Sequence, residues 1–193
     1  VTLLGWSWGT TLMATYTTQN AAKVERLALY APVWIRQTAS LVQAGPGPLA
    51  AYRTVRRDQA LGRWMTGVPE DKKATLIPAG WFDQWADATW ATDPQAAQNG
   101  LLRAPNGVLQ DLREYWSAGK PTYDAGAIRA PTLLVVGDWD QDTPLYMAQE
   151  LSQQLKNAAR KRLVVIPEAT HTVIMEKNRQ QLFKAVQTFL DED

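Results

Sequence analysis

The chain has 193 residues, enough for one substantial hydrophobic core but few for two compact domains. Its 20 Lys and Arg residues nearly balance its 19 Asp and Glu residues, so the net charge of +1 does not favour nucleic acid or an anionic membrane as a partner. The lack of Cys excludes disulfides and thiolate sites, and no apolar run approaches the ~18 residues of a membrane span. We therefore expect a soluble protein that binds neither nucleic acid nor membrane; its compartment stays open, with the cytoplasm slightly favoured.

The N-terminal part predicts a strand, a tight turn, a helix and a second strand. Residues 1–6 are a continuous apolar run, and residues 10–20 follow without a helix breaker. The second apolar run, RLALYA at residues 26–31, stops at Pro32. This order is typical of a β–α–β unit with parallel strands.

Residues 33–128 follow a different pattern. GPGP at residues 45–48 interrupts the chain, and the apolar residues after it are spaced for helices rather than strands. We expect a helical cap inserted between two strands. Its tryptophans either pack the cap against itself or form an apolar wall over a pocket; they are Trp34, Trp64, Trp81, Trp85, Trp90 and Trp116.

The C-terminal part returns to strands and helices. TLLVVG at residues 132–137 and RLVVI at residues 162–166 predict two further strands, and Thr143-Pro144 indicates the start of a helix between them. Continuous apolar strands that alternate with amphipathic helices predict an α/β fold with a parallel sheet covered on both faces. The expected core is residues 1–32 and 129–193, and the expected cap is residues 33–128.

The pattern G-x-S-x-G occurs in this chain as Gly5-Trp6-Ser7-Trp8-Gly9, between the first strand and the first helix. It matches the nucleophile elbow, in which the serine occupies a strained turn and side chains at the two glycines would collide with their neighbours. The backbone N–H of Trp8 then points to where a carbonyl oxygen gains negative charge. The context therefore predicts Ser7 as a nucleophile.

A serine nucleophile needs a base, and His171 is the single histidine of the chain. It follows the fourth predicted strand, where catalytic groups of open α/β sheets gather. An acid that orients His171 is expected among Asp138, Asp140 and Asp142, which follow the third strand. The same acids could suggest calcium, but an EF-hand loop starting at Asp138 would need other residues at its sixth and twelfth positions. We expect no metal and no cofactor.

With the order serine, acid, histidine and these contexts, the chain resembles the α/β-hydrolase family with a helical cap. The resemblance runs through the whole chain, and it implies Asp140 as the triad acid because GDWDQDTP at residues 137–144 fits the family form G-x-x-D-x-x-x-P. Gly-Trp-Ser is similar to carboxylesterases that cleave pimeloyl esters, and Ser-Trp-Gly is similar to proline iminopeptidases. Neither similarity decides the substrate.

Members of this family normally have four strands before the elbow, whereas here the elbow strand begins at residue 1. We therefore expect the chain to be a C-terminal portion. Its first strand would be an exposed apolar edge, covered by an N-terminal companion chain or by a second copy in a homo-oligomer.

The leading hypothesis is a serine hydrolase that cleaves an ester of a small hydrophobic substrate through Ser7, His171 and Asp140. The expected pocket residues are Trp6, Trp34, Trp81 and Trp85. A proline iminopeptidase is the nearest rival, with Asp83, Asp87 and Asp93 available to hold a substrate ammonium group. A hydrolase-like module that only binds a ligand or partner is the alternative from another class. Dehalogenases and epoxide hydrolases are excluded because they need a carboxylate nucleophile in place of Ser7.

Overall fold

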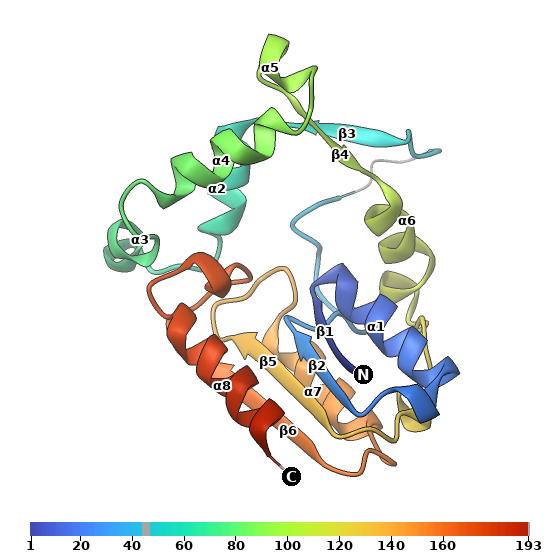
Figure 1. The fold of residues 1–193 in the computed structure, drawn as a ribbon. Helices are drawn as coiled ribbons and strands as arrows, with labels where there is room; N and C mark the ends of the chain where they lie inside the picture. Colours follow the sequence, from blue (N-terminus) through green and yellow to red (C-terminus); the bar gives the residue numbers. More distant parts are fainter. Residues whose placement is uncertain (44–46, 193) are drawn as a thin grey trace.

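The computed structural model describes residues 1–43 and 47–192 and contains a parallel sheet with a large excursion at one of its ends (Figure 1). The sheet has the strand order β1-β2-β5-β6, and all three pairs are parallel. Its strands are β1 (Thr2–Trp6), β2 (Arg26–Tyr30), β5 (Thr132–Gly137) and β6 (Lys161–Ile166). These are the strands expected from the sequence.

Helices cover both faces of the sheet, as expected. On one face α1 (Trp8–Gln19) and α7 (Leu145–Gln154) pack Ala14 and Leu151 against Leu29 and Leu134. On the other face α8 (Arg179–Asp191) packs Phe189 against alternate strand residues. Because successive residues of a strand point to opposite faces, strands that are buried on both sides need continuous apolar runs.

Strand β1 lies at the edge of the sheet and pairs with β2 alone. Its apolar side chains are partly exposed, with relative accessibilities of 52% for Leu4 and 39% for Trp6. The expectation that another chain or segment covers this edge stays a prediction.

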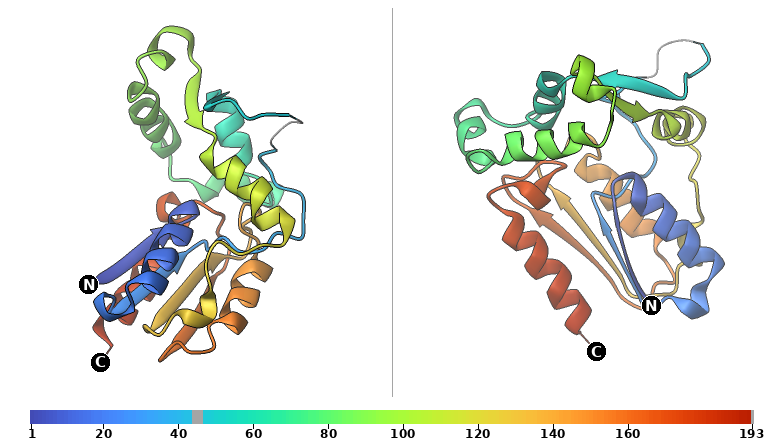
Figure 2. Two further views of the ribbon diagram at one scale, coloured as in Figure 1. Left: turned by 90° about the vertical axis from the view of Figure 1, so that its right-hand side faces the viewer. Right: turned by 45° about the horizontal axis from the view of Figure 1, so that its top comes forward.

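The excursion between β2 and β5 lies over the carboxyl ends of the strands (Figure 2). Its described residues form five α-helices: α2 (Arg57–Trp64), α3 (Glu70–Leu76), α4 (Trp81–Ala91), α5 (Ala96–Asn99) and α6 (Gly107–Glu114). Short 3-10 turns lie both in the excursion and in the rest of the described chain, at Ala21–Lys23, Trp116–Ala118, Ala125–Ala127 and Val173–Met175. No helix of the described ranges is both long and apolar enough to span a bilayer.

The excursion also contains a strand pair, which contradicts the expectation of helices alone. β3 (Tyr52–Val55) and β4 (Leu102–Pro105) are antiparallel, with Arg53 opposite Ala104. Each has only four residues, and their partners lie far apart in the sequence, so no local hairpin pattern announces them. Of the GPGP segment, Gly45 and Pro46 lie outside the described residues, while Gly47 has a positive φ of 99°.

Candidate active site

Ser7 occupies a strained backbone conformation between β1 and α1, with φ 55° and ψ −125°. Three contacts hold this turn. The Ser7 N–H donates to the Tyr30 carbonyl at 3.0 Å, the Thr10 hydroxyl donates to the Ser7 carbonyl at 2.5 Å, and the Val33 N–H donates to the Thr10 hydroxyl at 3.1 Å. A non-glycine residue keeps such a conformation only where its surroundings enforce it, and strain of this kind is concentrated at functional sites.

The two glycines of the turn are not equivalent. A Cβ atom at Gly5 would lie 2.6 Å from the carbonyl oxygen of Gly9, so only glycine allows α1 to pass so close to β1. A Cβ atom at Gly9 would meet no described atom within 4 Å. The steric prediction is therefore correct for Gly5 and wrong for Gly9.

Trp8 is the first residue of α1, so its N–H has no carbonyl partner within the helix. This N–H lies beside Ser7 at the positive end of the helix dipole. The Trp8 indole donates to the Asp111 carboxylate at 2.7 Å, and its ring packs on Gly107, where a Cβ atom would lie 3.2 Å from it. Trp8 thus connects the turn at Ser7 to α6 of the excursion.

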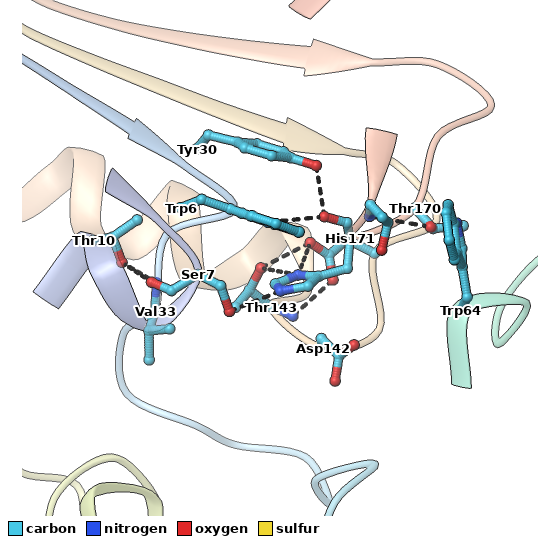
Figure 3. A network of polar contacts seen from close by, with 12 residues as sticks. Trp6, Ser7, Thr10, Tyr30, Val33, Trp64, Asp142, Thr143, Thr170 and His171 are labelled. Carbon is cyan, nitrogen blue, oxygen red and sulfur yellow. Dashed lines mark hydrogen bonds and ion pairs between the residues drawn. The ribbon is translucent and has the colours of Figure 1, made fainter. Parts of the chain in front are cut away.

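The side chains of Ser7, His171 and Asp140 form one line of hydrogen bonds. Figure 3 shows the Ser7 hydroxyl and the His171 ring that face each other. His171 Nε2 lies 2.8 Å from Ser7 Oγ, and His171 Nδ1 lies 2.9 Å from Asp140 Oδ2. Asp140 is 1% exposed and also accepts from the backbone N–H and the hydroxyl of Thr143, both at 2.8 Å. The imidazole therefore has the serine hydroxyl on one nitrogen and a fixed carboxylate on the other.

The three aspartates after β5 have separate partners. Asp138 accepts from the Ala169 N–H at 3.3 Å, Asp140 contacts His171, and Asp142 pairs with Arg63 at 2.8 Å. Asp138 therefore holds the histidine loop, and Asp142 contacts the excursion. Only the second, Asp140, is within hydrogen-bond distance of the imidazole among the described carboxylates.

The backbone carbonyl of His171 accepts two hydrogen bonds from aromatic side chains of the sheet. The Tyr30 hydroxyl donates at 2.6 Å and the Trp6 indole donates at 3.1 Å, while the two rings stack 5.6 Å apart. Burial raises the pKa of Tyr30, which keeps its hydroxyl protonated and available as a donor. These bonds fix the histidine loop independently of the imidazole.

Opposing effects act on the pKa of His171. Burial favours the neutral ring and lowers the pKa, but the charge and hydrogen bond of Asp140 raise it more, with a further contribution from Asp142. The result is a pKa above the ordinary value of 6.5. A base with a raised pKa binds the serine proton more strongly.

Glu176 is a fully buried carboxylate behind the histidine loop. It accepts from the N–H and the hydroxyl of Thr170, the residue before His171, and from the indole of Trp64 in α2 at 2.8 Å. Burial raises the pKa of Glu176, although these three donors act in the opposite direction. Glu176 therefore joins the histidine loop to the excursion.

Two adjoining cavities, of about 220 and 730 Å³, open beside Ser7 between the sheet and the excursion. Both are lined by Ser7, Trp8, Val42, Arg53, Arg63 and Asp142. The larger cavity also reaches His171 and is mainly apolar; its aromatic lining is Trp6, Trp8, Trp64, Trp85 and Trp90. Cavities of this kind accept small molecules with a large apolar part.

Of the four tryptophans predicted for the pocket, the structure places two in it. Trp6 and Trp85 line the larger cavity, whereas Trp34 and Trp81 line neither. Trp34 is 7% exposed and packs in the core beside Tyr123, because the chain leaving β2 turns toward the α7 face. Trp81 begins α4 and lies under the guanidinium of Arg179 at 4.4 Å. The structure therefore places these two indoles outside both cavities.

The acids offered for a substrate ammonium group do not line the cavities either. Asp87 pairs with Arg57 at 2.6 Å, Asp93 pairs with Arg103 at 2.6 Å, and Asp83 is absent from both linings. The Arg103 hydrogen bonds hold the pKa of Asp93 well below its usual range. The described residues thus provide no acidic cluster for the amine of a peptide substrate at these positions.

Sequence reasoning missed several residues of the site. Arg53, Arg63 and Glu176 are polar residues whose neighbours in the sequence carry no motif, and their contacts are with residues distant in the chain. The sequence held one signal for Arg53. In a strand over Tyr52–Val55, side chains alternate between two faces, which places Arg53 and Val55 on the same face.

The comparisons with known proteins agree with this architecture. The family model described as "alpha/beta hydrolase fold" matches residues 1–178. No curated protein has a significant sequence match.

Among solved structures, the CarC serine hydrolase involved in carbazole degradation has a TM-score of 0.64 and 18% identity, with 98% of this chain and 63% of that chain covered. The 2-hydroxy-6-oxo-6-phenylhexa-2,4-dienoate hydrolase of Rhodococcus sp. strain RHA1 has a TM-score of 0.64 and 14% identity, with 99% and 64% covered. An esterase from Exiguobacterium antarcticum has a TM-score of 0.53 and 20% identity, with 100% and 67% covered. The chain thus spans about two thirds of the length of these structures. Since the family model covers nearly all of its sequence, this chain belongs to the α/β-hydrolase fold family.

Proposed function

We propose that the protein is a serine hydrolase that cleaves carboxylic esters through an acyl-enzyme. The observation that carries the proposal is the line of hydrogen bonds in which His171 Nε2 lies 2.8 Å from Ser7 Oγ and His171 Nδ1 lies 2.9 Å from Asp140. This is the geometry that a serine nucleophile, its base and an orienting acid require.

In the first half of the proposed reaction, Ser7 Oγ attacks the ester carbonyl carbon while His171 Nε2 takes the hydroxyl proton. The carbonyl oxygen becomes an oxyanion that the Trp8 N–H stabilises. The tetrahedral intermediate then collapses, the bond to the alcohol breaks, and His171 returns its proton to the leaving alkoxide. Ser7 is left acylated.

In the second half, water attacks the acyl carbonyl while His171 takes one of its protons. Collapse of the second tetrahedral intermediate expels Ser7, which recovers the proton from His171, and the carboxylic acid leaves. Asp140 stays ionised throughout and stabilises the imidazolium. The apolar lining of the larger cavity supports a hydrophobic group on the substrate.

Labelling with a fluorophosphonate tests the nucleophile. We expect intact-mass measurement to find one adduct, which Ser7→Ala abolishes and His171→Gln slows. Ser40 also lines the smaller cavity, so Ser40→Ala is the matched control and should keep the adduct. A chain with native circular dichroism that gains no adduct would overturn the proposal and favour a module that only binds ligands. An adduct that survives in Ser7→Ala would also overturn it, because the nucleophile would then be another residue.

The rival peptidase activity is tested by comparing 4-nitrophenyl hexanoate with proline 4-nitroanilide. We expect turnover of the ester alone, because Asp83, Asp87 and Asp93 lie outside both cavities. Faster cleavage of the anilide would replace the esterase with a proline iminopeptidase-like enzyme.

A further inference from the structure

Three arginines line the smaller cavity beside Ser7: Arg36 follows β2, Arg53 lies in β3 and Arg63 lies in α2. Asp142 is the one carboxylate among the described residues of that lining. Even with Asp142 ionised, the charged groups around the cavity leave a positive excess.

Asp142 is already paired. Arg63 Nε and Nη2 lie 3.0 and 2.8 Å from Asp142 Oδ1, and Arg63 Nε lies 3.1 Å from Oδ2. This pairing joins one carboxylate to one guanidinium and so offsets one of the three positive charges. The excess charge therefore belongs to Arg36 and Arg53.

Arg36 and Arg53 donate to uncharged acceptors. Arg36 contacts the Asp142 main-chain carbonyl, the Thr38 hydroxyl at 3.3 Å and the Ala39 carbonyl at 3.2 Å. Arg53 contacts the Pro105 carbonyl at 3.0 Å and the Asn106 side-chain oxygen at 3.3 Å. Within residues 1–43 and 47–192, neither guanidinium forms an ion pair with a carboxylate.

The electrostatic surroundings of Arg53 are uniformly unfavourable to its charge. Burial lowers the pKa of Arg53, and the like charge of Arg63 lowers it further, with no acid acting in the opposite direction. Burial likewise lowers the pKa of Arg36, although Tyr146, Asp142 and Asp140 partly compensate. A half-buried guanidinium without an acidic partner costs free energy that a bound anion would restore.

Arg53 lines the same cavity as Ser7 and is linked to it indirectly, by a series of contacts. Its guanidinium bonds Asn106, the next residue Gly107 packs on the Trp8 ring, and Trp8 follows Ser7. Apolar side chains complete the same cavity; they are Val33, Val42, Val108, Leu109, Leu112 and Met147. The cavity thus presents an apolar surface together with positive charge.

We propose that the natural ester carries a carboxylate on its acyl group, which the cavity receives with the apolar acyl chain against its hydrophobic side chains and the carboxylate on Arg53 and Arg36. This inference rests on the proposed ester hydrolysis at Ser7 and specifies its substrate class: half-esters of dicarboxylic acids or esters of comparable acids. Guanidinium groups match carboxylates in shape and charge, which gives selectivity against neutral esters.

The test compares mono-4-nitrophenyl adipate with 4-nitrophenyl hexanoate, which share leaving group and acyl length and differ in the terminal carboxylate. We expect kcat/KM to be at least about tenfold higher for the adipate, as charged hydrogen bonds permit. Arg53→Met should reduce this ratio at least tenfold, and Arg53→Lys should retain part of it. A variant that lowers both rates equally would indicate a merely structural arginine and overturn the proposal.

Arg56→Met is the matched control, because Arg56 pairs with Asp58 on the surface and lines neither cavity. It should leave the ratio unchanged. Added salt should lower the ratio in the native chain, since the discrimination is electrostatic.

Binding to Ser7→Ala separates failure of this inference from failure of the proposed function. Isothermal titration should give at least tenfold tighter binding of monomethyl adipate than of methyl hexanoate, an advantage that Arg53→Met removes. If this preference appears but no ester is cleaved, the anion site stands and the hydrolase proposal fails. If hexanoate is cleaved through Ser7 and the carboxylate brings no preference in either assay, the anion site is wrong and the hydrolase stands.

Discussion

The sheet and the excursion position their side chains in different ways. Ser7, Asp140 and His171 follow β1, β5 and β6 on short loops, at the carboxyl ends of a buried parallel sheet. The lining residues of the excursion lie on short helices and on a strand pair whose halves, β3 and β4, are distant in the sequence. The line of hydrogen bonds at Ser7 therefore depends on the sheet, whereas the shape of the cavities depends on how the excursion packs.

Side-chain contacts between these two regions include Trp8 with Asp111, Arg63 with Asp142, and Trp64 with Glu176. Each of these joins a residue near the carboxyl ends of the strands to a helix of the excursion. We therefore expect substitutions at the carboxyl ends of the strands to act on kcat, whereas substitutions in the excursion should act on substrate binding or stability.

Loss of the base has the largest expected effect. His171→Gln should lower kcat for 4-nitrophenyl hexanoate by roughly 10⁶-fold, the loss seen when other triads lose their histidine. Trp85→Phe, at a lining residue of the excursion, should change kcat/KM less than tenfold and mainly through KM. Steady-state kinetics of both variants checks this, and equal losses would break the distinction between the two regions.

Loss of the orienting acid comes next. Asp140→Asn should lower kcat about 10⁴-fold, because an amide no longer holds the imidazole in its productive form. Asp138 bonds the Ala169 N–H and does not contact His171, so Asp138→Asn is the control and should cost less than tenfold. A larger loss at Asp138 than at Asp140 in the same assay would reassign the acid.

The buried contact between the excursion and the histidine loop should affect stability more than chemistry. Glu176→Gln replaces an acceptor oxygen with a donor amide facing Thr170 or Trp64, which should lower the free energy of unfolding by about 1–3 kcal/mol. Glu70→Gln, at a surface ion pair with Lys73, should stay within about 0.5 kcal/mol. Urea denaturation measures both. An unchanged Glu176→Gln variant would mean that the two regions are held together elsewhere.

The smallest effect is a shift in pH dependence. Since the neutral imidazole acts as base, kcat/KM should fall as the pH drops through the pKa of His171, with a midpoint above 6.5. Asp142 contributes to that raised pKa, so Asp142→Asn should move the midpoint to lower pH. Asp87→Asn, whose partner is Arg57 in the excursion, should leave it in place. A shift in the opposite direction would contradict the electrostatic account of His171.

The sheet could be predicted from the sequence because its information is local. Each buried strand is a continuous apolar run, and G-x-S-x-G and GDWDQDTP sit directly after two of these runs. Parallel strands end at one edge, so the order of the chain indicated that Ser7, His171 and one of the acids Asp138, Asp140 and Asp142 would lie close together. The choice of Asp140 came from the resemblance to the family.

The excursion could not be predicted in the same detail because its contacts join distant residues. The residues next to Trp81 in the sequence do not indicate its contact with Arg179. Those next to Arg53 do not indicate that β3 pairs with β4. Composition indicated an aromatic lining, but which indoles form it depends on helix orientation. Trp34 and Trp85 were equally plausible as pocket residues from the sequence, yet Trp34 packs in the core and Trp85 lines the larger cavity.

Trp6 has a second contact with His171, in addition to the hydrogen bond that its indole donates to the His171 carbonyl. Its indole ring lies 5.9 Å from the imidazole ring of His171. In the proposed reaction, His171 becomes a cation beside the π-electrons of this ring when it takes the serine proton, an attraction worth about 0.5–1 kcal/mol at a partly exposed site. This corresponds to roughly a two- to fivefold gain in rate if it is realised fully in the transition state. The aromatic residue that anchors the histidine loop would thus also stabilise the protonated ring that each half of the proposed reaction requires.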